Sequence, residues 1–198
     1  ELELKKMHSN DFVVACFRPS TVFGASPRFR SDIVYNNLVA CAYTTGRIEI
    51  LSDGSPWRPV VHVKDVCQAF ISGLEAPPEL VGGKAFNVGI PEGNFTVKEL
   101  AEAAQRSVPG CELVFLNEHT DPRTYRVSFK RILSELKDYF QPEYDLDRGG
   151  MELVDYFDKV NFTEKDFRGK ICNRLAQLKY LQENHSINNQ LRFSRNEI

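Results

Sequence analysis

The residues that carry the most chemical information lie between Ser52 and Asp65, where a turn leads into an apolar segment. The turn delivers Arg58 to the start of a strand predicted over 59–63, so its guanidinium is expected at the edge of a sheet. An immobilised guanidinium suits a diphosphate, because its planar fork donates parallel charge-assisted hydrogen bonds that contribute roughly 1.5–3 kcal/mol each. A surface ion pair is the alternative role for Arg58.

Two neighbours of Arg58 are assigned structural rather than chemical roles. His62 lies among apolar residues, which favours a core histidine over a catalytic one. Asp65 is predicted to cap a helix that runs to about Glu75, with Gln68 completing a capping box.

The rest of the chain alternates between short apolar runs and amphipathic segments with helix-boundary signals. We expect strands over 12–17, 48–51, 59–63, 85–89 and 113–116, and helices over 31–44, 65–75, 96–106 and 129–140, followed by two helices within 145–184. Because the strands are apolar throughout, as strands covered on both faces are, the pattern indicates an α/β fold built on a parallel sheet.

Composition excludes several functional classes. With 25 basic and 27 acidic residues among 198, no overall charge attracts nucleic acid or an anionic membrane. The apolar runs are too short to cross a bilayer and the N-terminus resembles no signal peptide, so a cytoplasmic protein is expected. The scattered cysteines and histidines lack ligand spacing, which argues against a metal site and a metal-dependent hydrolase: Cys16, Cys41, Cys67, Cys111 and Cys172, and His8, His62, His119 and His185.

An ordered series of motifs runs from Asp11 to about Lys137. It comprises Phe-Arg-Pro-Ser-Thr-Val-Phe-Gly at 17–24, Arg-Ser-Asp-Ile-Val-Tyr-Asn at 30–36, the segment 58–65, Phe-Asn-Val-Gly at 86–89 and Asp-Pro-Arg-Thr-Tyr-Arg-Val-Ser at 121–128. The series resembles the extended short-chain dehydrogenase/reductases that act on nucleotide sugars, including UDP-galactose epimerases and dTDP-glucose dehydratases.

The resemblance implies a role for five residues. Arg58 and Arg123 would clamp the diphosphate of a nucleotide-diphosphate sugar, and Asn36 would hydrogen-bond the substrate. Thr21, also assigned to substrate binding, stands where the family commonly has asparagine. Ser20 would contact the cofactor, NAD or NADP, beside its nicotinamide.

The second arginine has alternatives. Arg123 could instead form an ion pair with Asp121 or another nearby acid, and Arg126 competes for the same phosphate-binding role.

The resemblance also implies an architecture: the C-terminal part of a Rossmann-type parallel-sheet fold with a smaller α/β substrate-binding subdomain. Residues 1–10 are then the tail of a truncated helix, 11–140 the last Rossmann strands plus the substrate-binding subdomain, and 141–198 C-terminal helices and a polar tail. A homodimer is expected in the intact protein, through the helix that ends at Ser9.

Two of the family's motifs do not occur in this sequence. No tyrosine is followed four positions later by lysine, as in the family's catalytic Tyr-x-x-x-Lys pair, and no Gly-x-x-Gly-x-x-Gly turn is present to bind a pyrophosphate. We therefore assign no catalytic residue to this chain. It is expected to be a fragment, inactive as an oxidoreductase, with its catalytic and dinucleotide-binding motifs upstream.

The predicted function is the substrate-binding portion of an NAD(P)-dependent nucleotide-diphosphate-sugar epimerase/dehydratase. A nucleotide-sugar reductase on the same scaffold is one alternative, and a non-catalytic dinucleotide-sensing or scaffold relative is another. The sequence does not distinguish the base, the sugar, the reaction type, or NAD from NADP.

Overall fold

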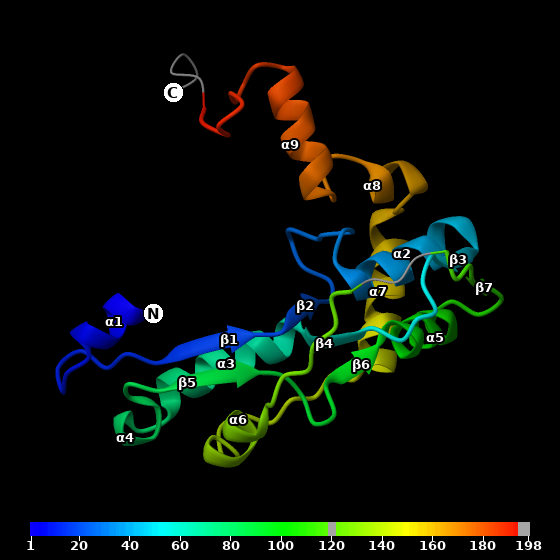
Figure 1. Cartoon of the computed structure of the whole chain (residues 1–198). Helices are drawn as coiled ribbons and strands as arrows, with labels where there is room; N and C mark the ends of the chain where they lie inside the picture. Colours follow the sequence, from blue (N-terminus) through cyan, green and yellow to red (C-terminus); the bar gives the residue numbers. More distant parts are fainter. Residues whose placement is uncertain (119–121, 194–198) are drawn as a thin grey trace.

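The computed structural model describes residues 1–118 and 122–193, which form three small β-sheets with helices packed against them (Figure 1). Two sheets are parallel pairs: β1 (Cys16–Pro19) with β5 (Ala85–Val88), and β3 (Arg47–Ile50) with β7 (Glu112–Phe115). In the third, β4 (Trp57–His62) lies between β2 (Thr21–Phe23), its parallel neighbour, and β6 (Asn94–Thr96), its antiparallel neighbour. The predicted α/β class with parallel strands is confirmed.

The expected helices occur in order along the chain, and one short helix, α4, was not predicted. The helices are α1 (Leu2–Met7), α2 (Val34–Thr45), α3 (Val63–Glu75), α4 (Pro78–Val81), α5 (Val97–Ser107), α6 (Lys130–Glu135), α7 (Leu146–Val160), α8 (Glu164–Arg168) and α9 (Arg174–Glu183). Two helix boundaries coincide with local sequence signals. Thr96 and Glu99 form a capping box at the start of α5, and Gly46, with φ of 69°, ends α2 in the left-handed conformation.

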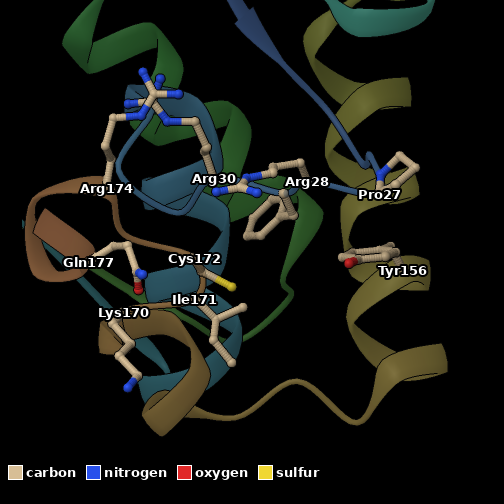
Figure 2. Close-up of a pocket in the computed structure, with 10 residues that line it drawn as sticks. Pro27, Arg28, Arg30, Tyr156, Lys170, Ile171, Cys172, Arg174 and Gln177 are labelled. Carbon is tan, nitrogen blue, oxygen red and sulfur yellow. The ribbon is translucent and has the colours of Figure 1, made fainter. Parts of the chain in front are cut away.

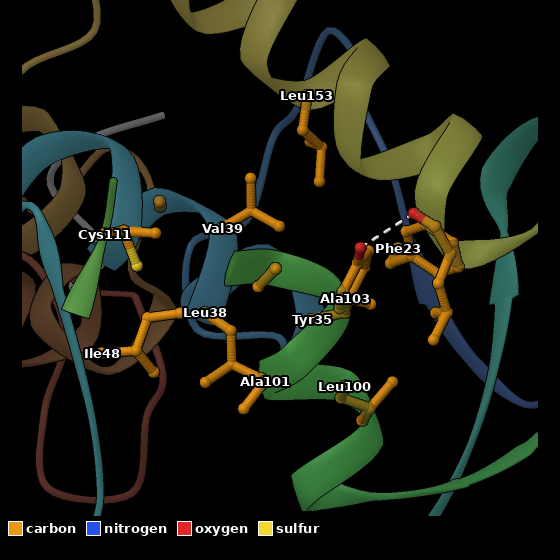
Figure 3. Packing of buried hydrophobic residues seen from close by; sticks show 14 of the residues in the cluster. Phe23, Tyr35, Leu38, Val39, Ile48, Leu100, Ala101, Ala103, Cys111 and Leu153 are labelled. Atoms are coloured by element: carbon orange, nitrogen blue, oxygen red, sulfur yellow. Dashed lines mark hydrogen bonds between the residues drawn. The ribbon is translucent and has the colours of Figure 1, made fainter. Parts of the chain in front are cut away.

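The larger hydrophobic core lies where α2, α5 and α7 meet (Figure 3). The buried Tyr35 of α2 donates its hydroxyl to the carbonyl of Leu146, 2.8 Å away, at the start of α7. A Cβ on Gly150 would lie 2.1 Å from Ser107 Oγ and 2.7 Å from the Tyr35 hydroxyl. The absence of a side chain at Gly150 therefore lets α7 approach the other two helices closely.

A second core lies between the β1–β5 sheet, α3 and α6. It contains the fully buried Phe86 and Val88 of β5 together with Val61 of β4, Ile132 of α6 and Leu136. Because Val61 and Val60 are consecutive residues of β4 that face different clusters, this strand has apolar contacts on both sides. It is the buried strand that the sequence predicted.

Several predicted boundaries were wrong. The strand expected over 12–17 begins only at Cys16, and Phe12 and Val13 are 49% and 38% exposed. The helix expected over 129–140 is confined to α6. The two helices expected within 145–184 are three, and the three-residue strands β2 and β6 were not predicted because they are too short to show periodicity.

The predicted capping role of Asp65 was also wrong. Helix α3 begins after His62, whose Nδ1 accepts the amide of Lys64 at 3.3 Å, so Asp65 falls inside the first turn. Its carboxylate instead accepts the amides of Glu143 and Tyr144, at 2.9 and 3.2 Å. Asp65 thus ties the segment before α7 to α3.

Candidate functional site

Arg58 lies in β4, opposite Phe95 of β6, and is half-buried. Its Nη1 donates to the carbonyl of Trp57 at 2.8 Å and to the carbonyl of Arg123. The guanidinium is therefore fixed near the start of β4, the middle strand of its sheet rather than an edge strand, and it is joined there to the coil that carries the second arginine.

That coil, residues 122–128, is held to the third sheet by side chains that the sequence did not single out. Thr124 accepts the amide of Trp57 at 3.0 Å through its hydroxyl. The side-chain amide of Asn94 donates to the carbonyl of Val127 at 2.9 Å and accepts the amide of the same residue at 2.8 Å. Neither Thr124 nor Asn94 belongs to a sequence pattern that indicates a hydrogen bond to a distant segment, so these contacts could not be predicted from the sequence.

Arg58, Arg123 and Thr21 line one pocket of about 560 Å³, which we call the clamp pocket. Three of the four predicted substrate-binding residues are thus brought together from β4, the 122–128 coil and β2. The remaining lining comes mainly from α2 and the residues before it, and the sequence did not assign it: Asp32, Ile33, Val34, Asn37, Leu38, Val97 and Tyr125.

The acid in this pocket is neutralised by a neighbour. Both carboxylate oxygens of Asp32 accept from the guanidinium of Arg30, at 2.9 and 3.0 Å. This contact holds the pKa of Asp32 below its usual value, so Asp32 stays ionised but paired. The wall of the clamp pocket therefore opposes a bound anion less than a lone carboxylate would.

Asn36, the fourth predicted residue, does not line the clamp pocket. Its side chain is buried, donates to the carbonyl of Arg30 at 2.9 Å and accepts the amide of Gly24 at 2.9 Å. These bonds fix the loop between β2 and α2. The neighbouring Asn37 faces the pocket instead, and a substrate contact by Asn36 stays a prediction.

Arg123 and Arg126, the two candidates for phosphate binding, lie in different places. The guanidinium of Arg126 stacks over the ring of Trp57, 3.4 Å from its centroid, and Arg126 does not line the clamp pocket. Asp121, the alternative partner considered for Arg123, lies outside the described residues. The geometry favours Arg123 over Arg126 for phosphate binding.

Ser20 lies beside a second hollow of about 350 Å³, which shares Thr21 and Tyr125 with the clamp pocket. The Ser20 hydroxyl is buried, and the described residues offer it no hydrogen-bond partner. A buried unsatisfied hydroxyl is costly, which makes it a natural contact for a polar ligand atom. Its predicted role at the cofactor stays a prediction.

His62 is fully buried, as expected for a core histidine, and is surrounded by charged and aromatic groups. Its ring stacks on Tyr144 with centroids 3.9 Å apart, and its Nε2 lies 2.8 Å from Glu152 Oε2, though not aligned as a hydrogen bond. The Lys64 ammonium contacts the other Glu152 oxygen at 2.5 Å. Burial lowers the pKa of His62 to about 4, so it is neutral at neutral pH.

Neither a metal centre nor a membrane span is found among the described residues. Residues 1–118 and 122–193 contain no group of three or more histidine, cysteine, aspartate or glutamate side chains that could hold a metal ion. In the same residues, no helix has the length and apolar character needed to cross a membrane. All five cysteines are described and are free thiols.

Residues 2–89 match the family model described as NAD dependent epimerase/dehydratase family. Over this stretch the chain is similar to that family. The match includes Ser20, Thr21, Asn36 and Arg58, and it ends before the 122–128 coil that carries Arg123. It agrees with the family that the sequence resembles.

Solved structures of nucleotide-sugar epimerases share the fold at low identity. UDP-glucuronic acid 4-epimerase from Bacillus cereus, solved with UDP-glucuronic acid and NAD, is 20% identical, with 76% of this chain and 46% of that chain covered and a TM-score of 0.59. ADP-L-glycero-D-manno-heptose-6-epimerase from Helicobacter pylori is 21% identical, with 79% and 47% covered and a TM-score of 0.60. UDP-glucose 4-epimerase from Thermotoga maritima, with UDP-glucose, is 23% identical, with 73% and 46% covered and a TM-score of 0.59. The chain spans about half the length of these epimerases.

The buried His62 predicts a pH-dependent stability. Because its pKa is about 4 in the fold and near 6.5 when unfolded, the unfolded chain binds more protons, and the free energy of unfolding should decrease as pH falls from about 6.5 to about 4. The loss should be on the order of a few kcal/mol. Glu152 partly offsets it by favouring the protonated ring, whereas Lys64 and Arg148 add to it.

Urea denaturation of the chain and of its His62→Gln variant across this pH range measures the effect. The variant should show a flatter dependence. Burial raises the pKa of Asp65, which acts in the opposite direction, but this contribution is common to both proteins and cancels in the comparison. Equal slopes for parent and His62→Gln would contradict the assignment.

Proposed function

We propose that these residues supply the substrate-binding part of an NAD(P)-dependent nucleotide-diphosphate-sugar epimerase/dehydratase. The observation that carries this proposal is the convergence of Arg58 and Arg123 on one pocket of about 560 Å³, a volume suited to a small-molecule ligand. Two guanidinium groups that line one pocket would match the two phosphoryl groups of a diphosphate.

The residues that line the clamp pocket differ in chemistry, and each kind would contact a different part of the ligand. Arg58 and Arg123 would bind the diphosphate, and the hydroxyl of Thr21, between the clamp pocket and the hollow at Ser20, would hydrogen-bond the sugar side of the ligand. Apolar side chains such as Ile33 and Val97 line the pocket as well and would exclude water from the charged contacts. The B. cereus and T. maritima epimerases, solved with UDP-sugars, support this class of substrate.

The hollow at Ser20 is where we propose that the nicotinamide would lie. The buried, unsatisfied hydroxyl of Ser20 and the side-chain amide of Asn87, which also lines this hollow, would contact it. A bound nicotinamide would supply hydride-transfer chemistry beside the sugar. This chain's own share is to hold the sugar beside that position, because the hollow and the clamp pocket share two lining residues.

Epimerase, dehydratase and reductase remain alternatives within this family, and no residue of this chain is assigned to acid–base catalysis. A non-catalytic dinucleotide-sensing or scaffold relative is the alternative outside the enzyme class. A Tyr-x-x-x-Lys pair in the intact protein would separate the two classes. A cytoplasmic location and the absence of nucleic-acid or membrane partners stay predictions based on composition.

The division of the chain into residues 1–10, 11–140 and 141–198 also stays a proposal. It assigns the clamp pocket to the middle segment alone, since every residue that lines the pocket falls within 11–140.

Removal of either clamp arginine should weaken nucleotide-sugar binding. Arg58→Ala and Arg123→Ala are each expected to reduce affinity by roughly 30-fold or more, because loss of one partner of a charge pair in an interface costs several kcal/mol. The change in affinity is measured by isothermal titration calorimetry of the 198-residue chain with a panel of UDP-, dTDP-, GDP- and CDP-sugars.

Arg126→Ala is the matched control for this experiment. It lies in the same coil, three residues from Arg123, but stacks on Trp57 outside the pocket and should leave affinity nearly unchanged. If Arg126→Ala loses more affinity than Arg123→Ala, Arg126 is the arginine that binds the phosphate. Full affinity in both Arg58→Ala and Arg123→Ala would refute the clamp.

The chain alone should bind nucleotide sugars without converting them. Its sequence holds neither the Tyr-x-x-x-Lys pair nor the glycine-rich dinucleotide turn, so we expect no NAD(P)-dependent turnover and poor NAD(P) binding. Incubation of the purified chain with NAD or NADP and the same sugars, analysed by chromatography, tests this. Any product formed in proportion to enzyme concentration would overturn the expectation.

We also propose a homodimer that uses the N-terminal helix. Three apolar side chains of α1, Leu2, Leu4 and Met7, are 78%, 45% and 59% exposed, which supports a partner on this surface. Sedimentation of the chain should show a concentration-dependent dimer that is lost when all three are changed to serine. Leu175→Ser, an exposed apolar position on α9, is the control, and a dimer that persists in the triple variant would exclude this interface.

A further inference from the structure

A separate cavity of about 400 Å³ lies between the loop at residues 27–30 and the segment at residues 170–177 (Figure 2). We call it the C-terminal cavity. It shares no lining residue with the clamp pocket, and most of its outer wall comes from residues after α8. The proposed nucleotide-sugar function makes no use of it.

The two sides of this cavity are joined by hydrogen bonds across more than 130 residues of sequence. The amide of Ser31 donates to the carbonyl of Cys172 at 2.8 Å, and the Ser31 hydroxyl donates to the carbonyl of Phe167 at 2.7 Å. The backbone amide of Arg174, at the start of α9, donates to Asp32 Oδ2 at 3.2 Å. These bonds make the cavity a fixed feature of the fold.

The lining of the C-terminal cavity is strongly basic. It contains Arg28, Arg30, Lys170 and Arg174 and no acidic residue. Asp32, just outside, neutralises Arg30. Within residues 1–118 and 122–193, no carboxylate forms an ion pair with Arg28, Lys170 or Arg174, so the charge there is uncompensated.

The basic groups are distributed unevenly. Figure 2 shows the guanidinium groups of Arg30 and Arg174 extending toward the same side, whereas Lys170 extends away from them. The Lys170 ammonium lies 3.0 Å from the centroid of the Tyr180 ring. Arginines therefore form the cationic side of the cavity, and their forked donors suit an oxyanion better than a point charge does.

Apart from Gln177, the remaining lining is apolar or aromatic. Phe29 is buried against α7, with its ring 5.3 Å from Phe157 and 5.7 Å from Tyr156. Ile171, in contrast, is 83% exposed beside the cavity. Burial raises the pKa of the Cys172 thiol, so this cysteine contributes apolar surface and not a thiolate nucleophile.

We propose that the C-terminal cavity binds a small ligand in which an oxyanion, phosphate or carboxylate, is attached to an apolar ring. Arg28 and Arg174, which line the cavity without an ion pair among the described residues, supply the positive charge that attracts the oxyanion, and the ring packs against Tyr156 and covers Ile171. The volume of the cavity is at the low end of the range for small-molecule sites, which limits the ligand to a compact molecule.

Phenyl phosphate, benzoate and inorganic phosphate are the probes that test this proposal on the 198-residue chain. Phenyl phosphate should bind saturably and more tightly than inorganic phosphate, because only the former has the ring. Comparison with benzoate shows which oxyanion is preferred. In amide-resolved NMR, the perturbed resonances should be those of residues 28–30 and 170–177.

Arg28→Gln and Arg174→Gln should each weaken phenyl phosphate binding about tenfold, as expected for loss of a charge-assisted contact. Lys179→Gln removes a positive charge from the same helix outside the cavity and should have no effect. Circular dichroism confirms that each variant retains its helices.

Failure of this proposal can be distinguished from failure of the proposed nucleotide-sugar binding at the clamp pocket. Arg58→Ala should leave phenyl phosphate binding at the C-terminal cavity unchanged while weakening nucleotide-sugar binding. If none of the probes binds saturably, or if Arg58→Ala abolishes phenyl phosphate binding while Arg28→Gln and Arg174→Gln do not, the C-terminal cavity is not the site and the proposal is overturned.

Discussion

The packing of His62 is the constraint on which the arrangement of the molecule depends. This residue ends β4, caps α3 through its Nδ1, stacks on Tyr144 and lies beside Glu152 of α7. A Cβ on Gly24 would lie 2.3 Å from its Nε2, so the loop after β2 can pass only because that position is glycine, which also has a φ of 113°. One buried side chain thus connects β4, α3, α7 and the loop that leads to α2, and these elements in turn place Arg58, Asp32 and Thr21 around the clamp pocket.

Hydrogen bonds to backbone and to uncharged side chains hold the segments that form the clamp pocket. Arg58 is oriented by backbone carbonyls, and Arg123 is carried by a coil that the amide of Asn94 and the hydroxyl of Thr124 attach to the sheet. The hydrogen bonds of Asn94 and Thr124 hold the coil that carries Arg123 against the strands next to Arg58. Buried polar side chains such as Asn94 and Asn36 therefore serve the site by fixing backbone rather than by touching a ligand.

Sequence patterns predicted the elements whose signals are local. The Thr96–Glu99 capping box, the glycine at the end of α2 and the apolar strand β4 are each specified by residues close in sequence. The role of Asp65 could not be predicted in this way. A carboxylate early in a helix gives the same sequence pattern whether it caps its own helix or accepts the amides of Glu143 and Tyr144. Arg58 and Arg123 were found through the order of motifs, but their convergence on Thr21, and the stacking of Arg126 on Trp57, required the tertiary structure.

The C-terminal cavity could not be predicted from the sequence, since the bonds between its two walls join residues 136 and 142 positions apart. Bringing Arg28, Arg30 and Arg174 together opposes folding through the repulsion of like charges, and the fold compensates with the Ser31 bonds to Phe167 and Cys172 and with the contact between Asp32 and α9. Asp32 is central to both cavities: its carboxylate lines the clamp pocket, and the same oxygens hold the guanidinium of Arg30 and the first amide of α9. A single ion pair therefore lowers the negative charge facing the proposed diphosphate and fixes the wall of the second cavity.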